Sequence, residues 1–191
     1  MMELLFATYN SHKLNEIRNA LGSMYTIQGL GDLNEKEIPE TGNTLEENSL
    51  IKAEYIFKKY QKACFSDDTG LEVSALNNEP GVFSDRYAGS GNSEDNIDLL
   101  LANLTDQKDR KARFKTIITY FDEKGKQFIF EGVAHGKIIL EKKGIQGFGY
   151  DPIFQPNGFE RTFAQMSLHQ KNKISHRGIA LKKLIAHLIS K

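Results

Sequence analysis

Two adjacent carboxylates, Asp67 and Asp68, lie in the segment S-D-D-T-G at residues 66–70. The apolar run before them predicts a buried strand over 63–66 that ends in a turn, and neighbouring side chains on extended backbone point to opposite sides. One carboxylate can therefore face a cleft while the other holds the turn. Such oxygen ligands suit Mg²⁺, which binds through one or two carboxylates and takes further ligands from substrate phosphates. Because Asp-x-Gly turns also occur without any function, the segment by itself leaves both interpretations open.

A second segment, T-Y-N-S-H-K at residues 8–13, is suited to binding an anion. It lies between a predicted strand and the first turn of a predicted helix, where backbone N–H groups and the helix dipole favour negative charge. Its side chains add hydroxyl, amide and ammonium groups. The segment lacks the glycines of a Walker A loop or of a G-x-G-x-x-G fingerprint, so neither motif is present. The alternative is that Asn10 only caps the helix.

Two further segments, G-F-G-Y-D-P at 147–152 and S-H-R at 175–177, offer groups for a nucleobase. In the first, an aromatic ring on a glycine-rich loop presents a stacking face, and Asp151 can accept hydrogen bonds from base N–H groups. In the second, donors stand at the start of the last predicted helix, where phosphate or a carbonyl oxygen is favoured. A plain turn and a plain helix cap explain these two segments equally well. The four segments together specify a triphosphate site.

The elements that must position these segments alternate between strand and helix. A strand is expected at 3–7, followed by a helix with apolar residues at i, i+3 and i+7, and a capping box at Thr44 and Glu47 begins a helix that reaches about Lys59. Further strands are expected at 71–73, 114–121, 127–134 and 137–140, and further helices from about Ser93 and from Ser175. Helices interleaved with strands predict an α/β fold with helices layered on a twisted sheet. We expect a single domain over residues 1–191.

The composition excludes several classes of protein. With 191 residues, 39% of them hydrophobic, and 25 basic against 25 acidic side chains, the chain has the length and balance of one globular domain and not of a disordered protein. It has no apolar run of about 18 residues, and its first residues lack the basic segment of a signal peptide, so we expect a cytoplasmic protein. The lone cysteine, Cys64, is expected to be a small buried apolar residue.

The zero net charge conceals a division along the chain. Residues 161–191 contain seven Lys or Arg and no acid, whereas the stretch from Asp32 to Glu54 is strongly acidic. Such a separation suits a site that needs carboxylates for a cation and bases for an anion. The alternative is one acidic and one basic helix, both facing solvent.

Six segments in order resemble the inosine triphosphatase family, the Ham1-like pyrophosphatases of non-canonical purine nucleoside triphosphates. They are T-Y-N-S-H-K-L-N-E at 8–16, E-T-G-N-T-L-E-E-N-S-L-I-K-A at 40–53, S-D-D-T-G-L-E-V at 66–73, P-G-V-F-S-D-R-Y-A-G at 80–89, G-F-G-Y-D-P-I-F at 147–154 and S-H-R at 175–177. Six ordered matches are far more specific than any one of them. The resemblance implies an elongated α/β fold of two lobes, with a central twisted mixed sheet flanked by helices and an active-site cleft between the lobes. It also implies a homodimer.

The same resemblance implies a Mg²⁺-dependent hydrolase acting on phosphoric anhydrides, which splits ITP, dITP and XTP into nucleoside monophosphate and pyrophosphate. Such an enzyme removes these nucleotides from the cellular pool. No nucleic acid and no membrane partner is expected.

Site residues follow from the resemblance segment by segment. Asp68 is then the general base and a metal ligand, and Glu40 is a second ligand. The phosphates are screened by Lys13, Lys52 and Lys171. The base stacks on Phe148, and its edge is read by Asp151, His176 and Arg177. The remaining substrate contacts implied are Thr8, Tyr9, Asn10, Ser11, His12, Thr69, Gly149 and Tyr150.

Two alternatives stay open at this point. A Maf-like nucleotide pyrophosphatase of related fold would prefer pyrimidine or modified nucleotides. A nucleotide- or RNA-binding module without turnover would use a basic face made of Arg110, Lys111, Arg113 and Lys115 together with the basic C-terminal end.

Overall fold

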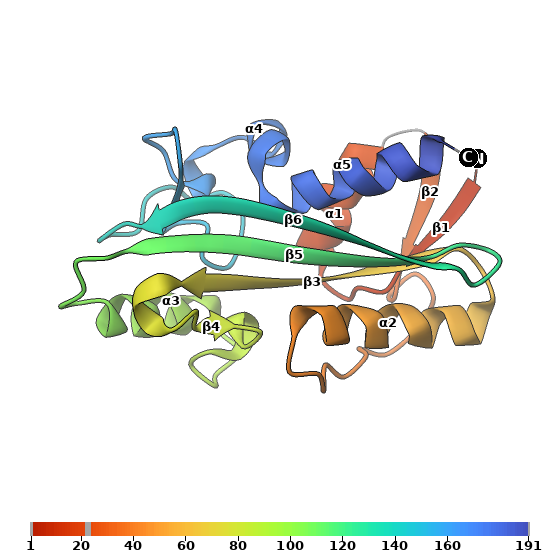
Figure 1. The fold of residues 1–191 in the computed structure, drawn as a ribbon, viewed down its shortest axis with the longest axis horizontal. Coiled ribbons are helices and arrows are strands. Elements are labelled where there is room, and N and C mark those ends of the chain that lie inside the picture. Colours follow the sequence, from red (N-terminus) through yellow and green to blue (C-terminus); the bar gives the residue numbers. More distant parts are fainter. Residues whose placement is uncertain (1, 22–23, 191) are drawn as a thin grey trace. The chain divides into compact units, whose positions relative to one another are not determined.

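The computed structural model describes residues 2–21 and 24–190. The strands in these residues form one mixed sheet (Figure 1). The strands are β1 (Met2–Phe6), β2 (Tyr25–Gly29), β3 (Cys64–Val73), β4 (Pro80–Gly81), β5 (Lys111–Phe121), β6 (Gln127–Ile138) and β7 (Phe154–Pro156). Their order is β2-β1-β3-β5-β6-β7, and β4 pairs with β3. β1 runs parallel to both β2 and β3, whereas the β3–β4 and β6–β7 pairs are antiparallel.

Helices accompany this sheet, as the alternation in the sequence predicts. They are α1 (Ser11–Leu21), α2 (Leu45–Tyr60), α3 (Ser93–Asn103), α4 (Leu168–Ile174) and α5 (His176–Ile189), with short 3₁₀ turns at Ser74–Leu76, Ser84–Arg86 and Phe163–Gln165. None of the helices in the described ranges is long and apolar enough to cross a membrane.

The chain divides into two compact units. Unit 1 consists of residues 1–68, 116–132 and 178–191, and unit 2 consists of residues 69–115 and 133–177. Strands β3, β5 and β6 contribute residues to both units.

Unit 1 is built on strands that bury both faces. Along β1, Leu4 and Phe6 pack in one cluster with α1 and α5, whereas Leu5, together with Ala7 just after the strand, packs in another with α2. Figure 1 accordingly shows α2 on one side of these strands and α1 and α5 on the other. Because side chains alternate along a strand, β3 continues the same division: Phe65 belongs to the first cluster and Cys64 to the second. The next residues of β3 are Ser66, Asp67 and Asp68, so the two carboxylates face different helices.

The start of α2 is fixed by its own sequence. The capping box predicted at Thr44 is present, since the Thr44 hydroxyl accepts a hydrogen bond from the Glu47 N–H and the Glu47 carboxylate accepts one from the Thr44 N–H. The Asn48 amide oxygen accepts a further bond, 2.7 Å long, from the Gly42 N–H. A Cβ at Gly42 would lie 2.6 Å from the Glu47 Cβ, so only glycine lets the chain approach α2 this closely.

Unit 2 has a separate core rich in aromatic rings. Phe114 lies 4.7 Å, between ring centroids, from Phe154, and Phe154 lies 5.1 Å from Phe163. The buried side of α3 packs in the same cluster through Ile97 and Leu100. This core supports the loops that follow β6.

Two sequence expectations are wrong. D-D-T-G is not a turn but the middle of β3, because lysines from neighbouring helices pair with both carboxylates within the strand. The strands expected at 127–134 and 137–140 are one strand, β6. Gly136 lies within it and pairs with β7. A Cβ at Gly136 would lie 2.3 Å from the Gln155 carbonyl oxygen of β7, so the close approach of the two strands requires glycine. A separate helix, α4, precedes Ser175 and was not predicted. Strand β2 was not predicted.

Candidate functional site

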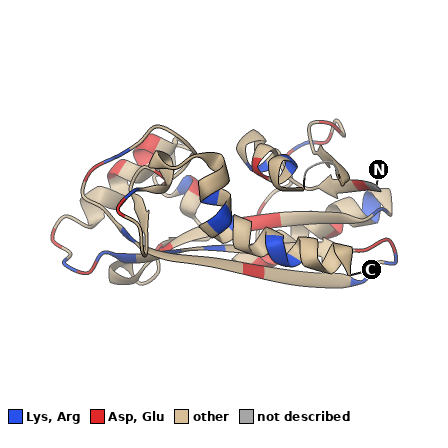
Figure 2. Cartoon of the chain, turned by 90° about the horizontal axis from the view of Figure 1, so that it is seen from above, with Lys and Arg blue, Asp and Glu red and all other residues tan. Residues whose placement is uncertain are grey.

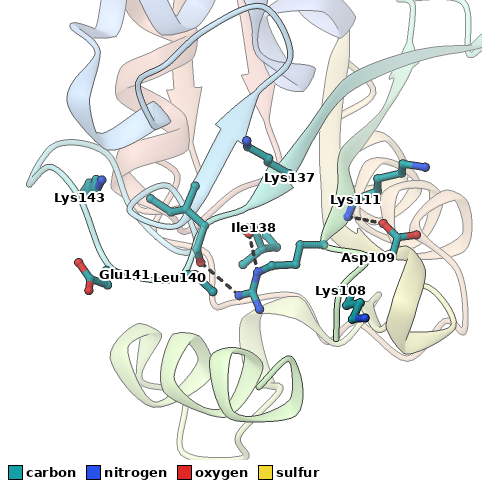
Figure 3. Close-up of a pocket in the computed structure, with 10 residues that line it drawn as sticks. Lys108, Asp109, Lys111, Lys137, Ile138, Leu140, Glu141 and Lys143 are labelled. Carbon is teal, nitrogen blue, oxygen red and sulfur yellow. Dashed lines mark hydrogen bonds between the residues drawn. The ribbon is translucent and has the colours of Figure 1, made fainter. Parts of the chain in front are cut away.

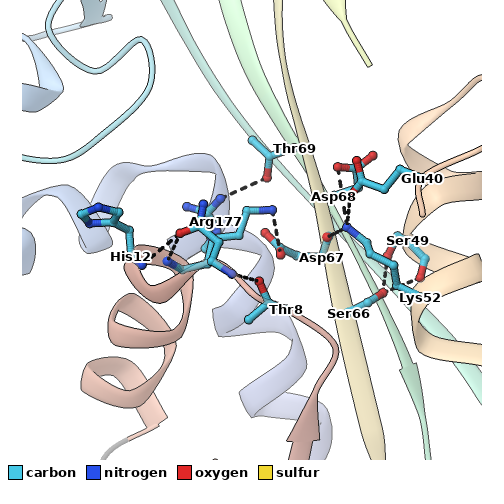
Figure 4. Close-up of polar contacts among 12 residues, drawn as sticks. Thr8, His12, Glu40, Ser49, Lys52, Ser66, Asp67, Asp68, Thr69 and Arg177 are labelled. Atoms are coloured by element: carbon cyan, nitrogen blue, oxygen red, sulfur yellow. Dashed lines mark hydrogen bonds and ion pairs between the residues drawn. The ribbon is translucent and has the colours of Figure 1, made fainter. Parts of the chain in front are cut away.

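Asp67 and Asp68 occupy opposite sides of β3, as predicted, and each faces a lysine of unit 1 (Figure 4). The Asp67 Oδ1 accepts a 3.0 Å hydrogen bond from the Lys13 Nζ of α1. The Asp68 Oδ1 lies 3.9 Å from the Lys52 Nζ of α2. Both carboxylates are buried, with exposed fractions of 1% and 5%. Two charges at the centre of a strand are tolerated only with such partners, so this arrangement is costly unless it serves a ligand or a reaction.

Lys52 lies among three carboxylates of unit 1, those of Glu40, Asp67 and Asp68, which together form the acidic cluster. Its ammonium donates to the Asp67 backbone carbonyl at 2.6 Å and to the Glu40 Oε1 at 2.5 Å. Burial works to lower the pKa of Lys52, but the nearby carboxylates of Asp68, Glu40 and Asp67 outweigh it and raise the pKa above its ordinary value. Lys52 is therefore a permanent cation at this site.

Asp68 has the electrostatic properties of a base that works near neutral pH. Burial raises the pKa of its carboxyl to about 6; Lys52 and Lys13 oppose this rise, and Glu40 and Asp67 add to it. A carboxylate with a pKa near the working pH combines a large ionised fraction with a useful affinity for a proton. The side chain can therefore accept a proton from a bound water.

The donor set of unit 1 fits a hard divalent cation. Glu40 and Asp68 already converge on one positive charge, the Lys52 ammonium. Among the residues that the structure describes, no group of three or more His, Cys, Asp or Glu side chains forms a metal cluster. Mg²⁺ needs no such cluster, since it binds proteins through one or two carboxylates and fills its shell with water and phosphate oxygens.

The predicted anion segment at residues 8–13 forms the turn between β1 and α1. Asn10 caps α1, as its Oδ1 accepts hydrogen bonds from the N–H groups of His12 and Lys13, at 2.9 and 3.1 Å. The Thr8 hydroxyl accepts one from the Asn10 N–H. Tyr9, Ser11 and His12 are exposed, whereas Thr8 is buried. The capping role of Asn10 is thus established, and the segment still presents a helix N-terminus flanked by the Lys13 ammonium.

In unit 2, the glycine-rich loop places the Phe148 ring next to two cationic side chains, Lys171 and Arg177. The Lys171 Nζ of α4 lies 4.9 Å from the centre of the Phe148 ring, and the Arg177 guanidinium carbon lies 5.5 Å from it. Lys171 also donates to the Asp151 Oδ2 at 2.7 Å, and the Phe148 N–H donates to the same oxygen at 3.0 Å. A Cβ at Gly147 would lie 2.0 Å from this oxygen, so the loop requires glycine there. Asp151 therefore fixes the loop that presents the ring.

The remaining predicted residues of unit 2 differ in what they contact. His176 is buried and stacks on Phe114 with ring centroids 4.5 Å apart. Arg177 is buried and donates to the Thr69 hydroxyl at 3.2 Å. The Tyr150 hydroxyl donates to the Ser84 carbonyl at 2.9 Å, and its ring belongs to the core. Tyr150 thus supports the loop, while its neighbour Gly149, with a φ of 58°, lets the chain turn.

The basic C-terminal end is only partly a solvated face. Figure 2 marks Lys and Arg along the helix that ends at the C-terminus. Two basic residues of the segment 161–191, Lys171 of α4 and Arg177 of α5, are buried at 3% exposure each, beside Phe148. The excess positive charge of this segment therefore contributes directly to the predicted base-binding loop.

Two arginines of the basic segment 110–115 in unit 2 make contacts within the fold, while Lys111 and Arg113 stay exposed. Arg110 donates to the backbone carbonyls of Leu104, Ile138 and Ile139 at 2.8 to 3.2 Å, and Arg113 pairs with Glu72 at 2.5 Å. Arg110 lines a pocket with a volume of about 640 Å³, and Figure 3 draws its lining residues. They are Lys108, Asp109, Arg110, Lys111, Lys137, Ile138, Ile139, Leu140, Glu141 and Lys143. Of these, only Arg110 and Lys111 were predicted, as part of the basic face of the alternative binding module. The two arginines of this segment thus have structural partners.

Sequence reasoning missed the part that Asp67 plays. The residue stands beside Asp68 in the motif, yet the motif alone gives a role only to Asp68. Alternation along a strand, combined with a lysine on the preceding helix, is the signal that assigns Asp67 to Lys13. The pairing of Lys171 with Asp151 was also missed, because no spacing rule connects side chains 20 residues apart on a loop and a separate helix.

The sheet and its helices define an α/β protein, with carboxylates and ammonium groups gathered in unit 1 and an aromatic ring flanked by cations in unit 2. A family model described as the Ham1 family matches residues 4–187. The protein belongs to the Ham1 family.

Individual relatives agree with this assignment. The chain is 50% identical over 189 residues to a dITP/XTP pyrophosphatase of Christiangramia forsetii, a match that covers 98% of this chain and 99% of that relative. It resembles the Ham1 protein of Staphylococcus aureus with a TM-score of 0.89, 39% identity and 98% coverage of both chains. It resembles a HAM1 protein from Coxiella burnetii with a TM-score of 0.90, 38% identity and full coverage of both chains. These comparisons confirm the predicted family and α/β fold and the expectation of an enzyme.

Proposed function

We propose that this protein hydrolyses the non-canonical purine nucleoside triphosphates dITP, ITP and XTP to the nucleoside monophosphate and pyrophosphate, with Mg²⁺ as cofactor. The proposal is supported by the names of its relatives and by the side chains of both units. The observation that carries it is Asp68, a buried carboxylate with a pKa raised to about 6 beside the cation Lys52 and a second carboxylate, Glu40.

Asp68 serves as the general base of the reaction. Above a pH of about 6 its ionised carboxylate accepts a proton from a water molecule, whose oxygen bonds to the α-phosphorus as the bond to the α-β bridging oxygen breaks. The bridging oxygen leaves with pyrophosphate, and Asp68 later returns its proton to solvent. Lys52 and Lys13 hold positive charge next to the two aspartates and so bind the phosphates and stabilise the leaving group.

Glu40 and Asp68 are the residues that would hold Mg²⁺. When bound, the ion supplies Lewis-acid neutralisation of phosphate charge. The N-terminal turn of α1 offers backbone donors for the remaining phosphate oxygens, since Lys13 and the residues before it stand at its positive end.

Base recognition falls to unit 2. Phe148 offers a stacking face, and Arg177 and Lys171 lie over that ring with their donor groups. His176, which stacks on Phe114, adds a further donor in unit 2. A carbonyl at the purine 6 position accepts such hydrogen bonds, whereas the amino group of adenine would leave the donors unpaired, at a cost of about 1–3 kcal/mol per buried group. Hypoxanthine and xanthine are therefore preferred over adenine.

The test is a product assay with the purified protein on ITP, dITP, XTP, GTP, ATP and dTTP, with and without Mg²⁺, followed by phosphorus NMR. We expect monophosphate and pyrophosphate from the first three, lost on chelation and lost in Asp68→Asn. The exposed carboxylate variant Asp106→Asn is the control and keeps full turnover. Release of orthophosphate, preference for dTTP, or an Asp68→Asn variant as fast as wild type would each refute the proposal.

A homodimer and a cytoplasmic location are part of the same proposal: the dimer rests on the family resemblance, and the location rests on the sequence pattern described above. Light scattering during size-exclusion chromatography tests the dimer, which a monomer's mass at the concentration of the kinetic assay would contradict.

A further inference from the structure

Two serine hydroxyls connect α2 to β3 beneath the acidic cluster of unit 1. Ser49 of α2 and Ser66 of β3 are both fully buried, at 0% exposure, and their Oγ atoms lie 3.0 Å apart (Figure 4). The Ser66 hydroxyl also donates to the Ser49 backbone carbonyl. From β5, the Thr119 N–H donates to the Ser49 Oγ at 3.0 Å. Three elements of unit 1 thus meet at one pair of hydroxyls.

Counting the hydrogens fixes the direction of each bond. A serine hydroxyl has one proton and two acceptor lone pairs. Because the Ser66 proton goes to the Ser49 carbonyl, the Ser49 hydroxyl must be the donor in the contact between the two Oγ atoms. The Ser49 oxygen accepts from Thr119, so both hydroxyls use their only proton and the arrangement has a single consistent orientation.

The serine pair stands directly next to the residues of the proposed reaction. Ser66 lies two residues before Asp68 and, by alternation, on the same side of β3; Ser49 lies one helical turn before Lys52 on α2. Lys52 must span from α2 to β3 to reach the Asp67 carbonyl at 2.6 Å and the Asp68 carboxylate at 3.9 Å. The separation of α2 and β3 at the serine pair therefore sets where the Lys52 ammonium meets the aspartates.

A second contact between the same two elements provides a natural comparison. Cys64, two residues before Ser66 on the same side of β3, donates through its Sγ to the Ala53 carbonyl of α2 at 3.5 Å. This contact lies about 7 Å further along the strand from the serine pair and away from Asp68. It shares the packing role of the serines but not their proximity to the site.

We propose that Ser49 and Ser66 are positioning residues, which fix the Lys52 ammonium against Asp67 and Asp68 and so set the catalytic geometry. The proposal rests on the proposed function for its catalytic consequence, but the geometry itself can be measured without turnover. Loss of one hydroxyl lets α2 and β3 separate slightly, which displaces the Lys52 ammonium. A displacement of about 1 Å at a catalytic group can reduce the rate by an order of magnitude or more.

The kinetic test compares Ser66→Ala with Cys64→Ala. We expect Ser66→Ala to lower kcat/KM for ITP by about tenfold, and Cys64→Ala to stay within twofold of wild type although both lower the midpoint of urea unfolding. Ser66→Cys keeps a donor of similar shape and should recover activity to within about threefold of wild type. Ser66→Ala removes two buried hydrogen bonds, each with a net contribution of about 1 kcal/mol, from a total stability of about 5–15 kcal/mol, so the variant remains folded.

The second test observes Lys52 directly by ¹⁵N NMR of its ammonium group, with Lys52→Arg used for assignment. In wild type the held ammonium should show a high order parameter and slow hydrogen exchange; both should fall in Ser49→Ala and Ser66→Ala and persist in Cys64→Ala. Unchanged signals in both serine variants would overturn the proposal, and so would an equal loss in Cys64→Ala. If wild type turns over no triphosphate, the proposed function fails, while the NMR result still decides whether the serines position Lys52.

Discussion

Replacing Asp68 by asparagine should stabilise the protein at neutral pH while it removes catalysis. The ordinary pKa of the carboxyl is 3.8, and in the folded protein burial raises it to about 6. The folded state therefore binds the Asp68 proton more tightly than the unfolded state does. The stability that this preference contributes is fully present below a pH of about 3.8 and is lost as the pH rises through about 6.

The size of the effect follows from the difference of about two in pKa. Each pKa unit corresponds to about 1.4 kcal/mol, so ionised Asp68 costs the wild-type fold about 3 kcal/mol above pH 7. The amide of the Asp68→Asn variant does not titrate and carries none of this cost. The free energy of unfolding of Asp68→Asn minus that of wild type should accordingly increase by about 3 kcal/mol between pH 3 and pH 7.5 and stay constant above that.

Urea unfolding at a series of pH values, with a chelator present, measures this difference. Pairwise subtraction cancels the titration of all other groups, and any fixed effect of the amide appears as an offset that does not depend on pH. The exposed control Asp106→Asn should give a flat difference over the same range. A flat difference for Asp68→Asn would refute the argument that burial dominates the electrostatics of this carboxylate.

Three further substitutions test other parts of the site. Gly42→Ala should lower the free energy of unfolding by about 1–3 kcal/mol, measured by urea denaturation, because the new Cβ would lie 2.6 Å from that of Glu47. Phe148→Ala should raise KM for ITP about tenfold with kcat within threefold, and an unchanged KM would exclude a stacking role. Lys171→Met should cost about 3–5 kcal/mol in thermal or urea unfolding, since it removes the cation that pairs with the buried Asp151; a loss below 1 kcal/mol would contradict this.

Local sequence rules predicted the elements that carry the site where the signal was local. The capping box at Thr44 and Glu47 predicted the start of α2, and strand alternation predicted that Asp67 and Asp68 would face opposite sides; both are confirmed. These predictions depend only on neighbouring residues and backbone geometry, which is why one sequence was sufficient.

The wrong predictions share a different origin. The segment D-D-T-G reads as a turn because aspartate and glycine avoid strands, but Lys13 and Lys52 from two helices pair with its carboxylates and keep the backbone extended. Strand β2 has the required alternation, with Tyr25 and Ile27 buried, yet five residues are too few to be distinguished from a loop. In each case partners distant in the chain decide the conformation, and their positions are not visible in the local pattern.

The link between Gly42 and Asn48 has a consequence for how this chain can change in length. Surface loops usually tolerate inserted or deleted residues, because few contacts depend on their path. Here Glu40 stands two residues before Gly42, whose N–H is held by Asn48, and the next two residues are held by Glu47. A residue added between Glu40 and Gly42 would leave α2 intact but move the Glu40 carboxylate by up to about 3.5 Å. Such a shift would break its 2.5 Å hydrogen bond to Lys52. The short stretch between Glu40 and α2 must therefore be kept at its present length.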